Sequence, residues 1–65
     1  MFDRNKFKAQ MALNGIGGKE LAEKMEMNES TLYRKIRDDG NFTRKEINNL
    51  ISILHIENPN DIFFN

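Results

Sequence analysis

The chain has 65 residues, and ten Lys and Arg balance ten Asp and Glu, so its formal net charge is zero. This length allows one small domain, and 38% hydrophobic with 31% charged residues is typical of a globular protein rather than a disordered one. With no Cys and one His, a disulfide framework and a zinc finger are excluded. No segment is apolar over the ~20 residues of a membrane span. The charged N-terminus does not fit a signal peptide, so we expect a cytoplasmic protein.

One local pattern marks the start of each expected helix. A capping residue follows an apolar residue and precedes another apolar residue four positions later, which is the spacing of a hydrophobic staple. In chain order the capping positions are Asp3, Gly17, Asn28 and Thr43. Thr43 and Glu46 also have the spacing of a complete capping box. We therefore predict helices that begin near residues 3, 17, 28 and 43.

Turn-forming residues mark the helix ends. Asn14-Gly15 is expected to close the first helix, and residues 38–41 are expected to form a loop. A turn of about three residues joins the short second and third helices, because the Asn28 cap needs a break before it. Asn58-Pro59 is expected to end the fourth helix and to open a short fifth one.

Apolar residues recur at helical rather than strand spacing. Ile47, Leu50, Ile51 and Leu54 form the stripe of a core helix. The other expected core residues are Phe7, Met11, Leu21, Ala22, Met25, Leu32 and Ile36. We therefore predict an all-α fold, a single domain over residues 1–65 with a small bundle of four to five helices.

The third helix carries the functional prediction. It follows a short helix and a tight turn, which is the order of a helix-turn-helix. The side opposite its two apolar residues presents one stripe, made of Glu29, Ser30, Tyr33, Arg34 and Arg37. A major groove admits one helix, and its base edges offer donors and acceptors to such side chains. We expect Arg34 to bind guanine, Glu29 to accept from cytosine, Ser30 to do either, and Tyr33 to touch a thymine methyl or a phosphate.

The segments GKELAEKM at residues 18–25 and MNESTLYRKI at residues 27–36 resemble the helix-turn-helix of phage Cro and lambda-type repressors. The resemblance extends over about residues 5–57, and Glu-Leu-Ala at residues 20–22 is its most specific signature. It implies a lambda-repressor-like DNA-binding domain that dimerises, binds two half-sites of double-stranded operator DNA and regulates transcription as a repressor.

Carried over by position, Glu29, Ser30 and Arg34 fall where the family reads bases, and Gly18 and Lys19 fall where it holds phosphate. Gly17-Gly18 stands in place of a Thr or Ser followed by Gln, so a side-chain contact to phosphate is lost; free amides at a helix N-terminus can replace it. Glu26 stands where the family usually has Gly in the turn. It must therefore adopt a left-handed conformation, or the turn differs.

Charge is unevenly distributed along the neutral chain. Residues 28–37 carry +2, from Arg34, Lys35 and Arg37 against Glu29, whereas residues 47–65 carry −2, from two acidic residues. Because phosphate electrostatics dominate DNA affinity, we expect a basic face and an acidic far end. The expected DNA-backbone contacts are Gly18, Lys19, Asn28, Lys35, Arg37, Arg44 and Lys45.

The C-terminus ends in three consecutive apolar residues, Ile62, Phe63 and Phe64. On a helix they point about 100° apart, so one small core does not readily accommodate all three. We expect residues 58–65 to be a dimerisation tail with these three residues in a two-fold interface. The alternative is that the same residues close the core.

Several patterns that resemble chemical sites lack the required spacing. The glycines at 15–18 follow no strand, residues 38–41 lack the distal Glu of a calcium loop, and His55 has no nucleophile paired with it. We therefore expect no enzyme activity, cofactor, metal or small-molecule ligand. The alternative functions are a protein-interaction module of the same fold, favoured by the zero net charge, Glu29 and the apolar tail, and a DNA accessory factor without repressor activity.

Overall fold

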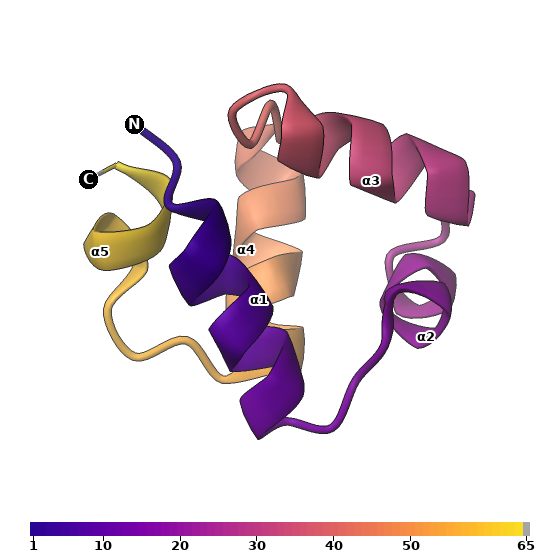
Figure 1. Ribbon diagram of the computed structural model, residues 1–65, viewed down its shortest axis with the longest axis horizontal. Helices are drawn as coiled ribbons and strands as arrows, with labels where there is room; N and C mark the ends of the chain where they lie inside the picture. Colours follow the sequence, from indigo (N-terminus) through magenta and orange to yellow (C-terminus); the bar gives the residue numbers. More distant parts are fainter. Residues whose placement is uncertain (65) are drawn as a thin grey trace.

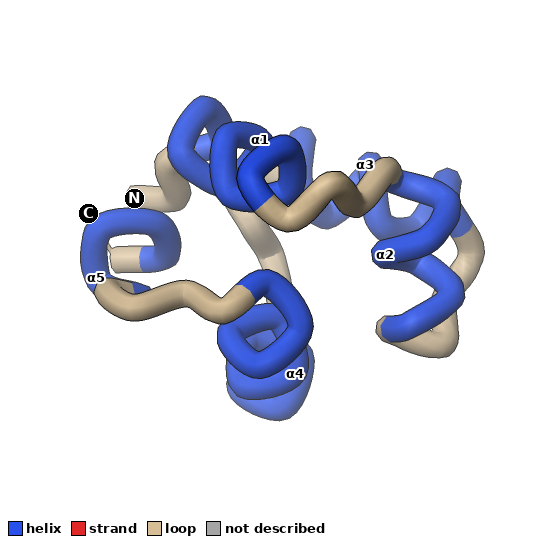
Figure 2. Tube along the Cα trace, turned by 90° about the horizontal axis from the view of Figure 1, so that it is seen from below, coloured by secondary structure: helices blue, strands red, loops and turns tan. Residues whose placement is uncertain are grey.

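The computed structural model describes residues 1–64, and helices are the only regular elements in this part of the chain. The helices are α1 (Arg4–Leu13), α2 (Gly18–Lys24), α3 (Glu29–Arg37), α4 (Arg44–Leu54) and α5 (Pro59–Phe63) (Figure 1). Figures 1 and 2 place the α2–α3 pair at one end of the molecule and α5 at the other, with α1 and α4 between them. The all-α prediction is thus confirmed. No helix in residues 1–64 combines the length and apolar character that crossing a membrane requires.

The four predicted helix starts are confirmed. The Asp3 carboxylate accepts a hydrogen bond from the Lys6 amide at 3.0 Å and caps α1. At α4 the Thr43 hydroxyl accepts from the Glu46 amide at 3.1 Å, and the Glu46 carboxylate accepts from the Thr43 amide at 2.8 Å. This reciprocal pair is the predicted capping box. α2 and α3 begin after Gly17 and Asn28 without a side-chain cap.

A left-handed residue follows each of the first two helices: Gly15 confirms the predicted end of α1, and Glu26 adopts the first of the two alternatives expected for the turn. Gly15 follows α1 with φ of 63°, and Glu26 follows α2 with φ of 57°. After α2 the amide of Met27 donates to the carbonyl of Ala22 at 3.0 Å, which is the long hydrogen bond of a Schellman motif. The turn between α2 and α3 is therefore tight, with Glu26 in its left-handed position.

The end of α4 differs from the prediction. The helix ends at Leu54 rather than at Asn58, because His55 adopts a left-handed conformation with φ of 52°. The amide of Ile56 then donates back to the carbonyl of Ile51 at 3.0 Å, and the Ile56 side chain is buried. The fifth helix begins as predicted, with Asn58 as its N-cap and proline at its first position.

The core contains a cluster of aromatic rings that the sequence did not predict. Five side chains are 0% exposed: Phe7, Leu21, Leu32, Leu50 and Leu54. The ring of Phe7 packs together with three further rings, at centroid separations of 5.4 to 6.4 Å within the cluster: Phe2, Phe42 and Phe63. Of the predicted core stripe on α4, Ile47 and Ile51 are only partly buried.

The C-terminal segment closes this core. Ile62 and Phe63 are 6% and 7% exposed, and the Ile62 carbonyl accepts a hydrogen bond from the Asp3 amide at 2.7 Å. The expectation that both side chains are exposed for a dimer interface is therefore wrong, because α5 packs them against the aromatic cluster. Phe64 is 64% exposed and remains on the surface. The last residue of the predicted tail, Asn65, lies outside the described residues.

Candidate nucleic-acid interface

The third helix is fixed to the core on one side and open on the other. In Figure 1, α2 is seen nearly end-on and α3 lies across the view, so the two helices cross steeply, as in a helix-turn-helix. Leu32 and Ile36 anchor α3 with 0% and 3% exposure. The opposite side, which we call the reading face, is exposed throughout as predicted and consists of Glu29, Ser30, Tyr33, Arg34 and Arg37.

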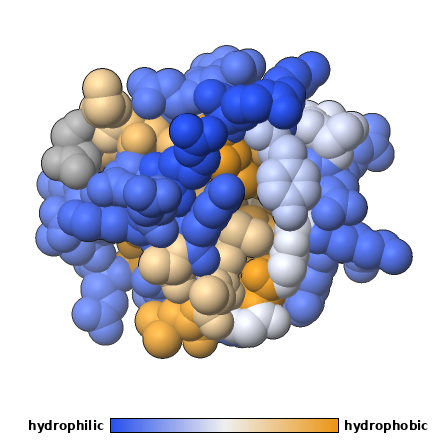
Figure 3. Space-filling model, in the orientation of Figure 1, coloured by the Kyte–Doolittle hydropathy of each residue, from blue (hydrophilic) through white to orange (hydrophobic). Residues whose placement is uncertain are grey.

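The reading face has side-chain donors and acceptors that are exposed to solvent and open to an external partner. Hydrophilic residues cover the edge of the molecule that α3 forms (Figure 3). Within residues 1–64 neither Arg34 nor Arg37 forms a salt bridge, since the ion pair of the described chain joins Lys35 to Glu46. The guanidinium donors of both arginines are therefore available to an external acceptor, and Ser30 adds a hydroxyl that can donate or accept.

Tyr33 is turned towards the start of α2. Its side chain is 41% exposed, and its phenol lies directly over Gly18, where any Cβ atom would overlap the ring. Gly18 is buried as a result, so it does not form the surface that was expected to hold phosphate, and Lys19 is the exposed member of that predicted pair. The glycine thus makes room for Tyr33. No sequence feature pairs these two residues.

Lys35 is not free to contact DNA in the way that was predicted. Its ammonium donates to the two carboxylate oxygens of Glu46 at 2.9 and 2.8 Å, and its side chain is 20% exposed. Burial raises the pKa of Glu46, but the hydrogen bond from Lys35, the hydrogen bonds from Thr43 and the Lys35 charge outweigh it, so the pKa lies below its usual value. The carboxylate therefore stays ionised at neutral pH. The pair fastens α3 to the first turn of α4.

The other residues predicted to contact the DNA backbone lie on the protein surface. These exposed residues are Lys19, Asn28, Arg37, Arg44 and Lys45. Because the Lys35–Glu46 pair joins the two helices, the first turn of α4 with Arg44 and Lys45 lies close to the end of the reading face. A cation in the first turn opposes the helix dipole, so neither residue is there to stabilise α4.

A second surface is apolar. A groove of about 440 Å³ is lined by Arg44, Ile47, Asn48, Ile51, Pro59 and Phe64. Ile47 and Ile51 are partly buried, and the exposed ring of Phe64 is the largest apolar side chain on the rim. We call this surface, formed by α4 and α5, the apolar groove.

No cluster of three His, Cys, Asp or Glu residues that could hold a metal ion occurs within residues 1–64. The single histidine, His55, is exposed at the left-handed end of α4 and has no aspartate or glutamate within salt-bridge distance in the described chain. Its position is explained by the helix end rather than by chemistry.

Comparison of the chain with protein-family models, with curated proteins and with solved structures found no match.

Proposed function

We propose that this protein is a sequence-specific DNA-binding transcriptional regulator that acts as a Cro-like repressor on operator DNA. The observation that carries the proposal is the reading face of α3, whose arginines form no ion pair with the described residues, on a helix anchored by Leu32 and Ile36. Such a helix fits one major groove. Action in the cytoplasm of a bacterial or phage-infected cell belongs to the same proposal.

The mechanism is steric. Arg34 donates to a guanine, and Ser30 and Glu29 contact neighbouring base edges. Tyr33, which leans over Gly18, lies at the margin of the reading face. A dimer bound to two half-sites about one helical turn apart covers the promoter and excludes polymerase. Because the net charge is zero, we expect weak non-specific binding, with affinity that depends on base contacts.

Substitution of Arg34 by alanine is expected to cost about 1–3 kcal/mol of binding free energy and to relax preference at one base pair, because a bidentate guanine contact is lost. The measurement is selection from random duplex DNA at about 100 mM salt, a concentration at which phosphate contacts still contribute. The parent protein is expected to enrich an inverted repeat, whose spacing reports the geometry of the dimer.

Lys24→Ala is the matched control, since Lys24 is an exposed cation at the end of α2 and outside the reading face. It should enrich the same sequence as the parent. Unchanged base preference in Arg34→Ala would overturn the assignment of Arg34. Absence of enrichment by the parent would favour the protein-interaction module instead, and a reporter assay without repression would favour the DNA accessory factor.

We also propose that the protein is a homodimer joined through the apolar groove. The groove extends from Arg44 in the first turn of α4 to Phe64 after α5, and α5 lies at the end of the molecule away from α2 and α3 (Figures 1 and 2). A partner centred on Phe64 therefore leaves both reading faces open, with Arg44 at the edge of the groove nearest α3. Phe64 is the only one of the three predicted interface residues on the surface. Its exposed ring lines the same groove as Ile47 and Ile51, and an apolar patch of this kind favours a two-fold interface.

Phe64→Asp is expected to raise the dimer dissociation constant tenfold or more, because a charge replaces an aromatic anchor in the interface. Sedimentation equilibrium of the full chain measures this constant. Leu13→Asp is the control, since Leu13 is 79% exposed at the end of α1 and outside the groove. An equal loss of dimer in both variants, or a monomeric parent, would contradict the proposed interface.

A further inference from the structure

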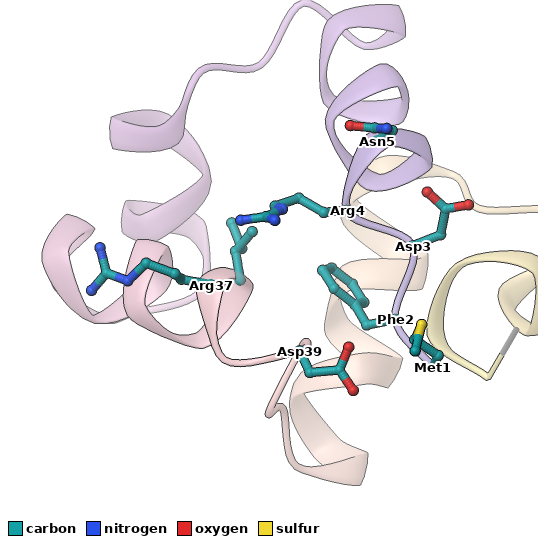
Figure 4. Close-up of a pocket in the computed structure, with 8 residues that line it drawn as sticks. Met1, Phe2, Asp3, Arg4, Asn5, Arg37 and Asp39 are labelled. Atoms are coloured by element: carbon teal, nitrogen blue, oxygen red, sulfur yellow. The ribbon is translucent and has the colours of Figure 1, made fainter.

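An additional basic residue lies next to the reading face, on α1. Arg4 is exposed in the first turn of α1, and it lines a groove of about 420 Å³ together with Phe2, Ile36 and Arg37. Figure 4 shows the Arg4 side chain extending from α1 towards the last turn of α3, from which Arg37 projects outwards. The groove therefore brings two arginines from separate helices to one end of the reading face.

The position of Arg4 is fixed by the residues before it. The Phe2 ring packs at 5.4 Å from Phe7 and 6.1 Å from Phe42, and it lies against Gly40 in the loop that joins α3 to α4. The Asp3 amide donates a hydrogen bond to the carbonyl of Ile62. The first turn of α1 is thus held against the end of α3, and Arg4 is presented by a rigid element.

Nothing in the fold accounts for the charge of Arg4. It forms no salt bridge with the described residues, and as a cation in the first turn it opposes the dipole of its own helix. The last turn of α3 already contains three basic residues, so its dipole needs no further cation. The nearby carboxylates do not neutralise Arg4, since Asp3 caps α1 and points away from it in Figure 4, and Asp39 lies on the far side of Phe2.

We propose that Arg4 contacts a DNA phosphate that flanks the bases read by α3, so that the DNA-binding surface extends from the helix-turn-helix onto α1. The inference rests on the proposed function and adds a contact to it. Arginine suits this role because its planar guanidinium binds phosphate through paired hydrogen bonds. Arg37 contacts a neighbouring phosphate of the same DNA backbone.

The test compares the salt dependence of DNA affinity between the parent protein and its variants. The probe is the duplex that the parent protein enriches from random DNA. Arg4→Ala is expected to reduce the slope of log affinity against log salt by about 0.9, the value of one phosphate contact. It should weaken all sequences alike and leave base preference unchanged. Arg4→Lys, which keeps the charge, should restore the slope and part of the affinity.

Lys6→Ala is the matched control, because Lys6 is exposed on the same helix but lines the groove on the other side of α1, with Leu13 and Asp61. Its slope should equal that of the parent. A second readout locates the contact: replacing single phosphates by methylphosphonate should reveal one position that weakens the parent several-fold and leaves Arg4→Ala unaffected.

Equal slopes for Arg4→Ala and Lys6→Ala, or equal sensitivity of the parent and Arg4→Ala to every methylphosphonate, would overturn the inference while the proposed function stands. Failure of the parent to bind any duplex would overturn both. Thermal unfolding followed by circular dichroism verifies that each variant is folded. A large loss of stability in Arg4→Ala with an unchanged salt slope would instead assign Arg4 to the fold.

Discussion

Substitution of Phe63 by alanine is expected to destabilise the protein by about 3–5 kcal/mol, the usual cost of removing a buried phenylalanine. The ring is 7% exposed and packs against Phe2, Phe7 and Phe42 at centroid separations of 5.9, 6.4 and 6.4 Å. A domain this small is stabilised by only about 3–5 kcal/mol from its core. Most of the variant should therefore be unfolded at 25 °C, as urea titration followed by circular dichroism would show.

Phe64→Ala is the matched control, since the adjacent ring is 64% exposed. At protein concentrations below the dimer dissociation constant, its loss should change the free energy of unfolding by about 0.5 kcal/mol or less, as for ordinary surface substitutions. Truncation after Asn60 should unfold the chain, because it removes both Ile62 and Phe63 from the core, whereas the tail interpretation predicts a folded monomer. A folded, monomeric Phe63→Ala protein would restore that interpretation.

The helix boundaries could be predicted because their causes lie within a few residues. Asp3 and Thr43 cap through hydrogen bonds to residues three positions later, at 3.0 and 3.1 Å. Gly15 and Glu26 become left-handed because each helix ends in the same local hydrogen-bond pattern. The end of α4 was missed because no Gly or Asn marks it, and His55 takes the left-handed position instead.

The contacts that shape the candidate site join residues that are distant in sequence, so local patterns do not contain them. Lys35 is predicted to contact DNA as one of the cations of residues 28–37, yet it forms an ion pair with Glu46 on the next helix. At Gly18 the sequence predicts only the loss of a glutamine contact to phosphate. In the structure, the absence of a side chain at Gly18 leaves room for the Tyr33 ring. The exposed stripe of α3 was predictable because it depends only on helical spacing and on which residues are buried.

The charge distribution on the surface follows from the same contacts. The Lys35–Glu46 pair removes one cation from the predicted basic face but fastens the end of α3 beside the exposed Arg44 and Lys45. Arg4 adds a further cation at the C-terminal end of α3, where it lines a groove with Ile36 and Arg37. A chain with zero net charge thus concentrates arginines that form no ion pair within residues 1–64 near one end of α3, as the proposed contacts to DNA phosphates require.

Gly40→Ala is expected to destabilise the protein by about 2–5 kcal/mol, from two causes that add. Gly40 has φ of 67°, a conformation that costs an L-residue about 1–2 kcal/mol. A Cβ atom there would also overlap the ring of Phe2, and relieving such overpacking typically costs about 1–3 kcal/mol. Urea titration of the variant measures the sum.

The other glycines separate the two causes. Gly15 has φ of 63°, and no heavy atom lies within 4 Å of the place that a Cβ atom would occupy, so Gly15→Ala should show the backbone cost alone. Gly17 has ordinary φ and open space, so Gly17→Ala should cost only about 0.5–1 kcal/mol, because alanine is a poorer N-cap than glycine for α2. Phe2→Leu combined with Gly40→Ala should cost less than the sum of the single changes, because a smaller side chain relieves the overlap. If Gly40→Ala lowers the free energy of unfolding no more than Gly15→Ala does, then Phe2 does not pack on the loop. The packing that is inferred to hold the first turn of α1, and with it Arg4, against the end of α3 would then be absent.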